Sequence, residues 1–229
     1  MQVYWLGRAA YAATWDLQEQ LRQRVLGGGP EALLLCEHEP VLTLGRYASD
    51  SEILADAATL RAHGVAAARS SRGGKVTYHG PGQLVVYPVV RLRAGVLAHV
   101  QWLAEAVVEV ARGFGVAAAF QREQVGVWAG ARKLAAIGVN VQRRVAIHGL
   151  ALNVTAAATA PFRSGWFVPC GLAQSQTTSL AEEMADAAAT SPAPDVAAVV
   201  EPLAAALCRR AGWPAAPVLP STVSLLSQT

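Results

Sequence analysis

Apolar side chains recur at every third or fourth position in several parts of the chain, which is the spacing of an amphipathic helix. The clearest case is residues 96–114, whose apolar face would consist of Val100, Leu103, Val107 and Val110. A weaker pattern predicts a helix over residues 11–26. Ser179 and Asp195 are N-cap residues that predict two further helices, a short one to residue 187 and a last one to residue 211. Pro202 would kink the last helix or mark its true beginning.

Runs of apolar or alternating residues predict the strands. They cover residues 2–6, 32–37, 41–44, 65–70, 84–92, 116–120, 125–128, 133–141 and 145–154. Short turns separate the last three, and such connections force an antiparallel meander. Helices and strands alternate without the steady rhythm of a doubly wound sheet. We therefore predict an α+β fold with a mixed, largely antiparallel sheet and helices packed on it, and an irregular tail after residue 214.

The composition fits one domain that spans residues 1–229. The chain is 53% hydrophobic, which is ample for a core, and it shows no internal repeat or low-complexity linker. Its net charge of +3 is weak and no basic stripe is visible, so we expect no nucleic-acid partner. No apolar run is long enough to span a membrane and the start is no signal peptide. We expect a soluble cytoplasmic protein without membrane partners.

Three cysteines, Cys36, Cys170 and Cys208, are an odd number without paired spacing, so we expect neither a disulfide framework nor a metal site. Cys36 and Cys208 stand among apolar residues and are typical of packing thiols. Cys170 lies between Pro169 and Gly171, which places it in a loop. On this evidence a structural thiol and a positioned nucleophile are equally good interpretations of Cys170.

The most unusual segment is residues 72–83, which hold four glycines beside Arg72, Lys75 and His79. Glycines this dense let a backbone approach a ligand closely, although for a single Gly-Gly pair a plain loop between two strands is the better explanation. Because the segment carries more polar side chains than a turn needs, we interpret it as a loop that forms the wall of a binding site.

Lys133 begins a predicted strand. Strict alternation would place it on the same face as Ala135 and Ile137, with Leu134 and Ala136 on the other. A lysine on an apolar face either reaches water at a sheet edge or is partly buried. Burial would disfavour its charged form and lower its pKa towards the range useful for proton transfer.

Five motifs in register resemble the lipoyl(octanoyl) transferases, which begin protein lipoylation. They are Glu37-His38-Glu39-Pro40-Val41-Leu42-Thr43-Leu44-Gly45, Arg72-Gly73-Gly74-Lys75-Val76-Thr77-Tyr78-His79-Gly80-Pro81-Gly82-Gln83, Lys133-Leu134-Ala135-Ala136-Ile137-Gly138, His148-Gly149-Leu150-Ala151-Leu152-Asn153 and Pro169-Cys170-Gly171. The resemblance implies the fold of lipoate and biotin protein ligases, which is related to the catalytic domain of class II tRNA synthetases.

The same resemblance implies an acyl transfer in two steps that needs no metal, ATP or other cofactor. Octanoyl-acyl carrier protein would donate its acyl group to Cys170 as a thioester. The group would then pass to a lysine of a lipoyl domain of the 2-oxoacid dehydrogenases or of the glycine cleavage H protein. Lys133 would favour the thiolate form of Cys170 and later accept a proton from the incoming amine.

The family's substrate-binding segments also map onto this sequence. They imply that the acyl site is lined by Arg72, Gly73, Gly74, Lys75, Val76, Thr77, Tyr78, His79, Ala136, Ile137, Gly138, Gly149, Leu150 and Ala151. Small residues there would leave room for an eight-carbon chain, and backbone N–H groups could hold the developing oxyanion. Lys75 stands where the family varies. His79 is either a pocket residue or a structural histidine, and His148, which we expect at the end of a strand, is interpreted as structural.

Two other functions remain open at this point. An ATP-dependent lipoate or biotin ligase would share the fold but would need no nucleophilic cysteine, so Cys170 argues against it. A non-catalytic domain that only binds acyl carrier protein or acylated lysines is the alternative from another class.

Overall fold

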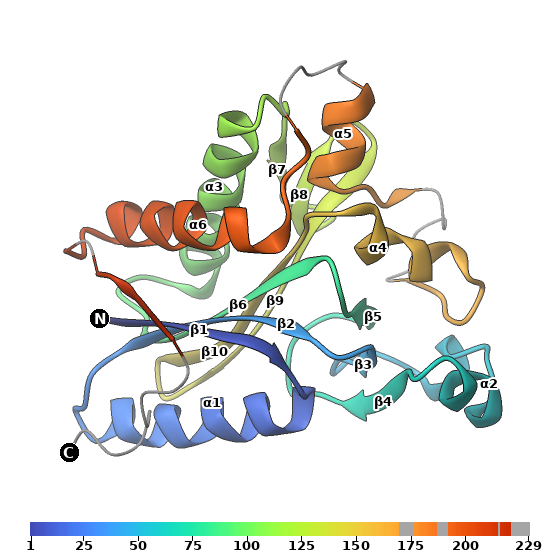
Figure 1. Ribbon diagram of the computed structural model, residues 1–229. Helices are drawn as coiled ribbons and strands as arrows, with labels where there is room; N and C mark the ends of the chain where they lie inside the picture. The colour runs from blue at the N-terminus through green and yellow to red at the C-terminus, as the bar shows by residue number, and fades with distance from the viewer. Residues whose placement is uncertain (170–175, 187–191, 215, 221–229) are drawn as a thin grey trace.

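The computed structural model describes residues 1–169, 176–186, 192–214 and 216–220. Most described strands belong to one eight-stranded mixed sheet (Figure 1). In spatial order they are β11 (Val218–Pro220), β1 (Gln2–Ala9), β2 (Ala32–His38), β6 (Gln83–Arg91), β10 (Val145–Asn153), β9 (Arg132–Gln142), β8 (Gly126–Ala129) and β7 (Ala119–Gln121). Strand β1 is parallel to β2 and β11, and the other pairs are antiparallel. The α+β class with a largely antiparallel sheet is confirmed.

Helices cover both faces of this sheet (Figure 1). Helix α1 (Tyr11–Leu26) packs on one face, and α3 (Val96–Gly113) and α6 (Val196–Ala211) pack together on the other. The central strand β6 shows why both faces are apolar. Its Leu84 and Val86 lie in the core below α3 and α6, whereas Val85 and Tyr87 lie in the core below α1. A strand with a helix on each side is buried at both its odd and its even positions.

A smaller three-stranded sheet lies at one end of the molecule (Figure 1). Its strands, in spatial order, are β4 (Ala66–Arg69), β3 (Val41–Leu44) and β5 (Val76–His79). Beside them are η1 (Asp50–Glu52), α2 (Ala57–Ala62), α4 (Ala156–Thr159) and η2 (Ala160–Arg163). A third apolar cluster, which includes Phe162 and Phe167, packs against this sheet.

Most predicted elements appear with small shifts at their ends. The predicted helix 11–26 and strand 41–44 are confirmed to the residue, and the meander of β8, β9 and β10 is antiparallel as expected. Asp195 caps α6 by accepting a hydrogen bond from the Ala198 N–H at 2.8 Å. Ser179 precedes α5 (Leu180–Asp186), the short helix expected there, and accepts a hydrogen bond from the Glu182 N–H at 3.3 Å.

Two expectations about these elements are wrong, one alternative is excluded, and two elements were not predicted. The glycine-rich segment is not loop throughout, because residues 76–79 form β5 and pair with β3. The tail contains β11, because an apolar Val-Leu pair can extend the main sheet beside β1. Of the two alternatives given for Pro202, the structure excludes the helix start, because α6 begins at Val196 and runs through the proline. The helical turns α4 and η2 were not predicted, because four-residue helices are too short to show a period.

Among the described residues, no helix is long and apolar enough to cross a membrane.

Candidate functional site

Lys133 faces the candidate site because strand β9 contains a β-bulge. Val127 pairs with Ala135, but the next residue of β8, Trp128, pairs with Lys133, so β9 has one extra residue, Leu134. Leu134 and Ala135 are consequently both buried in the core below α3. The expectation that Lys133 shares a face with Ala135 is therefore wrong. The bulge reverses the alternation and places Lys133 on the cavity side with Ala136.

The Lys133 side chain lies along the inner surface of strand β8. Its Nζ donates a hydrogen bond to the Val125 carbonyl at 3.3 Å and stands 5.0 Å from the centre of the Trp128 ring. A Cβ atom at Gly126 would come within 2.8 Å of the Lys133 Cε. Glycine at position 126 therefore leaves the space that the lysine stem occupies.

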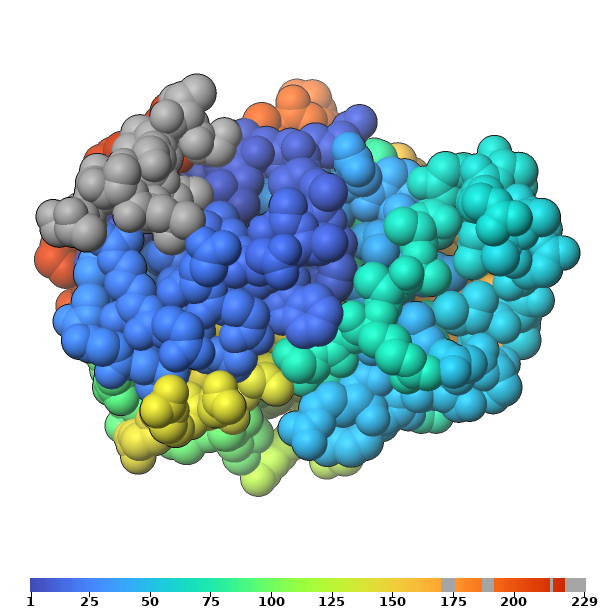
Figure 2. Space-filling view, turned by 90° about the horizontal axis from the view of Figure 1, so that it is seen from below, coloured from blue at the N-terminus to red at the C-terminus, as the bar shows by residue number. Residues whose placement is uncertain are grey.

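Lys133 borders a cavity of about 640 Å³ between the main sheet and the glycine-rich segment. Of the fourteen binding residues predicted above, twelve line it: Arg72, Gly73, Gly74, Lys75, Thr77, His79, Ala136, Ile137, Gly138, Gly149, Leu150 and Ala151. Val76 and Tyr78 do not, because they alternate to the other face of β5 and pack in the third apolar cluster. Figure 2 shows the side of the molecule on which α1, the glycine-rich segment and the β9–β10 turn lie side by side.

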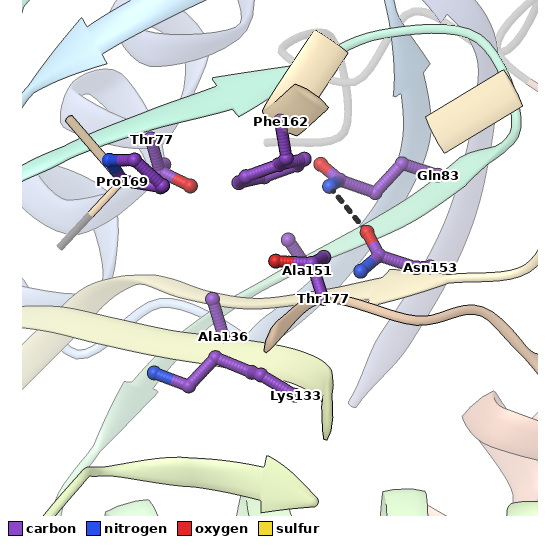
Figure 3. A pocket seen from close by; sticks show the side chains of 9 residues that line it. All are labelled: Thr77, Gln83, Lys133, Ala136, Ala151, Asn153, Phe162, Pro169 and Thr177. Atoms are coloured by element: carbon purple, nitrogen blue, oxygen red, sulfur yellow. Dashed lines mark hydrogen bonds between the residues drawn. The ribbon is translucent and has the colours of Figure 1, made fainter. Parts of the chain in front are cut away.

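A smaller cavity of about 20 Å³ adjoins the large one and shares Thr77, Lys133, Ala136 and Ala151 with it. Figure 3 shows Lys133 and Ala136 on one side of this space, and Pro169 and Phe162 on the other. Thr177 also lines it and forms a parallel β-bridge with Lys133. Cys170, the predicted nucleophile, lies outside the described residues.

Arg72 holds the glycine-rich segment in shape. Its guanidinium is buried and donates hydrogen bonds to the Thr43 carbonyl at 2.6 Å and to the Thr43 hydroxyl at 2.7 Å. It also donates to the carbonyls of Gly73 at 3.0 Å and Lys75 at 2.9 Å. One planar side chain thus ties the loop at residues 73–75 to strand β3. The loop is further tied to β9, since Gly73 N–H donates to the Val139 carbonyl.

Two further cations are Lys75, within the glycine-rich segment, and Arg46, whose backbone N–H donates to the Arg72 carbonyl. The Lys75 ammonium forms an ion pair with Glu52 at 3.1 Å, and its side chain is 47% exposed. Arg46 is exposed and does not line either cavity.

His79 stands at the end of β5 and is almost completely buried. Its Nδ1 lies 2.7 Å from Oε1 of Gln83, and its ring stacks on Tyr11. Burial, with smaller contributions from His38 and Arg72, lowers the pKa of His79 to about 3. The ring is therefore neutral at physiological pH.

His148 lies inside β10 and not at a strand end as expected. It faces Pro88 of β6, and pairing between the two strands is interrupted there, since proline has no N–H for the ladder. His148 adopts the left-handed conformation (φ 57°), and its Nε2 lies 2.9 Å from the Ser71 hydroxyl. Burial lowers its pKa to about 3.

Gly149 and Gly138 are needed for close backbone packing more than for the volume of the cavity. A Cβ atom at Gly149 would lie 2.2 Å from the Val86 carbonyl oxygen, and one at Gly138 would lie 2.9 Å from the Gly73 carbonyl oxygen. These glycines permit close contact between chain segments. Room for a ligand is left instead by the small side chains of Ala136 and Ala151, which are neighbours across β9 and β10.

The sequence interpretation missed several lining residues, among them Tyr11, Val85, Tyr87 and Val139. The Tyr11 hydroxyl donates to the Ser70 hydroxyl at 2.8 Å, and the Tyr87 hydroxyl lies 2.7 Å from His38 Nε2. The available signal was the alternation along β6, which puts Val85 and Tyr87 on one face. Periodicity could not say which face meets the cavity, because both are apolar.

The family described as the lipoyl protein ligase A/B catalytic domain matches residues 10–208 of this chain. A relative named octanoyltransferase from Chloroflexus aggregans is 42% identical over 91% of this chain and 93% of its own length. Others with that name are 44% identical in Geobacter metallireducens, covering 79% of this chain and 82% of theirs, and 40% identical in Mycolicibacterium gilvum, covering 80% and 76%.

Solved structures show the same fold at low identity. A lipoate-protein ligase A bound with ATP has a TM-score of 0.73 and 16% identity, and covers 96% of this chain and 89% of its own. A biotin protein ligase from Leishmania major has a TM-score of 0.52 and 13% identity, and covers 93% and 76%.

Proposed function

This chain belongs to the family of lipoyl protein ligase A/B catalytic domains, and from that premise we propose how it transfers an octanoyl group. It is an acyltransferase that supplies octanoyl groups for protein lipoylation, with an acyl carrier as donor and lipoyl domains as acceptors. We propose octanoyl-acyl carrier protein as the donor. The proposed acceptors are the lipoyl domains of 2-oxoacid dehydrogenases and the glycine cleavage H protein.

The proposed reaction has two steps with Cys170 as nucleophile. In the first, the Cys170 thiolate attacks the donor thioester, a new carbon–sulfur bond forms, and the carrier thiolate leaves and takes up a proton. In the second, the ε-amine of the acceptor lysine attacks the Cys170 thioester, an amide forms, and the Cys170 thiolate leaves. The proton of the amine passes to Lys133, whose own proton was given to the departing carrier thiolate.

The observation that carries this proposal is that Lys133 and Pro169 line the same small cavity. Pro169 directly precedes Cys170, and consecutive Cα atoms are about 3.8 Å apart. On the other side of residues 170–175, Thr178 N–H donates to the Lys133 carbonyl at 3.0 Å. Described residues on both sides of the cysteine segment therefore lie at the small cavity or on the strand of Lys133.

The Lys133 ammonium would supply the electrostatic assistance that a thiol needs. A free cysteine has a pKa of about 8.5, so a few per cent is thiolate at neutral pH. A cation close to the sulfur favours the thiolate, and each unit by which the pKa falls corresponds to about 1.4 kcal/mol. At the two other cysteines burial outweighs any nearby charge and raises the pKa of the thiol.

Intact-mass spectrometry after incubation with octanoyl-acyl carrier protein tests this proposal. We expect the mass of one octanoyl group in place of one hydrogen, and peptide mapping should locate it on Cys170. A Cys36→Ala/Cys208→Ala double variant should still be labelled, whereas Cys170→Ser should not. An adduct on Cys36 or Cys208, or full activity of Cys170→Ala, would show that the assignment of the nucleophile is wrong.

The same preparation distinguishes the ligase alternative. A ligase that activates the free acid as an adenylate would exchange pyrophosphate with ATP when octanoate or lipoate is added. We expect no such exchange, because the proposed route starts from a thioester that is already activated.

A further inference from the structure

A continuous chain of hydrogen-bonded side chains connects the cavity wall to the strand of Lys133. His79 Nδ1 lies 2.7 Å from Oε1 of Gln83, and Gln83 Nε2 donates to Asn153 Oδ1 at 2.8 Å (Figure 3). Asn153 Nδ2 in turn donates to the Thr178 carbonyl at 2.9 Å. Thr178 N–H donates to the Lys133 carbonyl. The side chains of His79, Gln83 and Asn153 come from three strands, and all three residues are buried.

Backbone carbonyls fix which atom donates in each hydrogen bond of this series, because a carbonyl can only accept. The Thr178 carbonyl requires the amide nitrogen of Asn153, so the Asn153 oxygen faces Gln83. The Asn153 oxygen and the Tyr78 carbonyl at 3.4 Å both require the amide nitrogen of Gln83. The Gln83 oxygen is left to accept from His79. His79 therefore carries its proton on Nδ1 and a lone pair on Nε2.

His79 lines the open cavity. Within the described residues its ring makes a hydrogen bond through Nδ1 and none through Nε2, so Nε2 is the ring nitrogen left for a ligand. Because burial keeps the pKa of this imidazole near 3, the ring is too weak a base to take a proton at neutral pH. The neutral ring can instead accept a hydrogen bond at Nε2, in a direction fixed by the orientation of the ring.

We propose that His79 Nε2 accepts a hydrogen bond from an N–H group of the substrate, and that Gln83 and Asn153 are positioning residues that hold His79 in the required tautomer. The inference rests on the proposed function, which supplies two substrates with N–H groups. One is the amide of the carrier's phosphopantetheine arm, and the other is the amine of the acceptor lysine. The amine attacks the carbonyl carbon that reacts, and the amide is joined to the sulfur of that thioester by a short ethylene linker, so both would approach the cavity beside Lys133.

At its other end, this series of hydrogen bonds holds the backbone of Lys133. Asn153 fixes the carbonyl of Thr178, while the N–H of Thr178 and the bridge at Thr177 fix the backbone of Lys133. The acceptor on His79 and the ammonium on Lys133 are thereby held in one rigid frame. A substrate whose N–H binds His79 is therefore also oriented relative to the Lys133 ammonium.

The first experiment is ¹⁵N NMR of the histidine rings in Cys170→Ser protein, which cannot form the thioester. The His79 resonances are assigned by their loss in His79→Gln. We expect a protonated, pyrrole-type Nδ1 and an unprotonated, pyridine-type Nε2 at pH 7. Addition of octanoyl-pantetheine, or of a peptide with the acceptor lysine, should shift the Nε2 resonance towards the hydrogen-bonded range. A proton on Nε2, or no shift with either substrate, would overturn the proposal. Because no acylation is needed, this result is independent of whether Cys170 is the nucleophile.

The second experiment compares His79→Phe with His79→Gln in the two half-reactions. Phe keeps a ring without an acceptor, whereas Gln restores an acceptor oxygen. We expect His79→Phe to slow one half-reaction about tenfold, as the loss of one neutral hydrogen bond would, and His79→Gln to recover most of it. Loss in acylation by the carrier identifies the phosphopantetheine amide as the donor, and loss in transfer from the acylated enzyme identifies the lysine amine. Wild-type rates for His79→Phe in both would contradict the proposal.

A double-mutant cycle tests the positioning role of Gln83. Gln83→Met has a similar length but makes no hydrogen bonds, and we expect it to slow the same half-reaction as His79→Phe. In the His79→Phe background, Gln83→Met should cost no further rate, because the group it orients is gone. Losses that multiply would show that Gln83 acts in some way other than through His79.

Discussion

The two long walls of the cavity are built in different ways. One wall consists of strands β9 and β10, whose backbones are fixed by the sheet and whose side chains, among them Lys133 and Ala136, face the space. The other is the glycine-rich segment, which lines the space with Gly73 and Gly74 as well as with Thr77 and His79, and whose backbone is held by the Arg72 guanidinium. The strand wall is thus held by the sheet, and the loop wall by one buried side chain.

This difference predicts how each wall responds to substitution. In the strand wall, the sheet maintains the backbone, so a changed side chain should alter rate or specificity and leave stability nearly intact. In the loop wall, one buried side chain maintains the backbone, so its loss should lower stability first. The four predictions below test this contrast, beginning with the largest effect.

Lys133→Met should lower the rate of octanoyl transfer by about 10²–10⁴-fold, the range for loss of a positioned acid–base group. Met retains the apolar stem beside Trp128, so the free energy of unfolding should change little. Single-turnover transfer and urea unfolding measure the two quantities. Arg122→Met, an exposed change on the neighbouring turn, is the control. A Lys133→Met enzyme within threefold of wild type would remove the lysine from the mechanism.

Arg72→Lys should reduce the free energy of unfolding by about 2–4 kcal/mol. An ammonium cannot serve the Thr43, Gly73 and Lys75 carbonyls together, and a buried acceptor left without a donor costs about 1–3 kcal/mol. Urea unfolding measures the change. Arg69→Lys, at an exposed ion pair with Asp50, should change it by less than about 1 kcal/mol. Equal stability of the two variants would show that Arg72 does not maintain the loop wall.

Acid should destabilise both walls alike, because each contains a buried neutral histidine. His79 and His148 have pKa values of about 3 in the folded protein, against about 6.5 when unfolded. The unfolded chain binds more protons between these values. The stability is therefore complete above pH 6.5 and falls towards pH 3, by about 1.4 kcal/mol per pH unit for each histidine. When urea unfolding is measured from pH 7 to 4, His79→Gln should reduce the pH dependence of the unfolding free energy by about 1.4 kcal/mol per pH unit, the contribution of one histidine. An unchanged slope would contradict the burial of a neutral ring.

Ala136→Val should alter acyl-chain preference, with the smallest effect of the four. Its side chain faces the cavity beside Ala151, so two added methyl carbons should disfavour octanoyl relative to hexanoyl transfer by about tenfold in kcat/KM. Competition between octanoyl- and hexanoyl-carrier protein measures the ratio. Ala135→Val, which enlarges the core below α3, should lower stability and leave the ratio unchanged. A shifted ratio in the Ala135 variant, and not in the Ala136 variant, would reverse the assignment of faces.

The sequence determined the elements of the fold where the pattern is local. The helix over residues 11–26, the strand over 41–44 and the antiparallel meander follow from periodicity and turn length, and the structure contains them. The motifs also indicated which segments meet, since twelve of the fourteen predicted binding residues line one cavity. Such patterns can be read from the chain because neighbours in sequence share one backbone geometry.

Only the tertiary structure decided which side chains of those segments face the cavity. The bulge at Leu134 places Lys133 opposite to its expected face, and the pairing of β5 directs Val76 and Tyr78 into a core while Thr77 and His79 face the cavity. The tautomer of His79 depends on carbonyls of Tyr78 and Thr178, the second of which is far away in the sequence. The bulge, the strand face that meets the cavity and the proton position on His79 all depend on contacts with other strands or segments. The periodicity of one segment does not show which other segment it will contact.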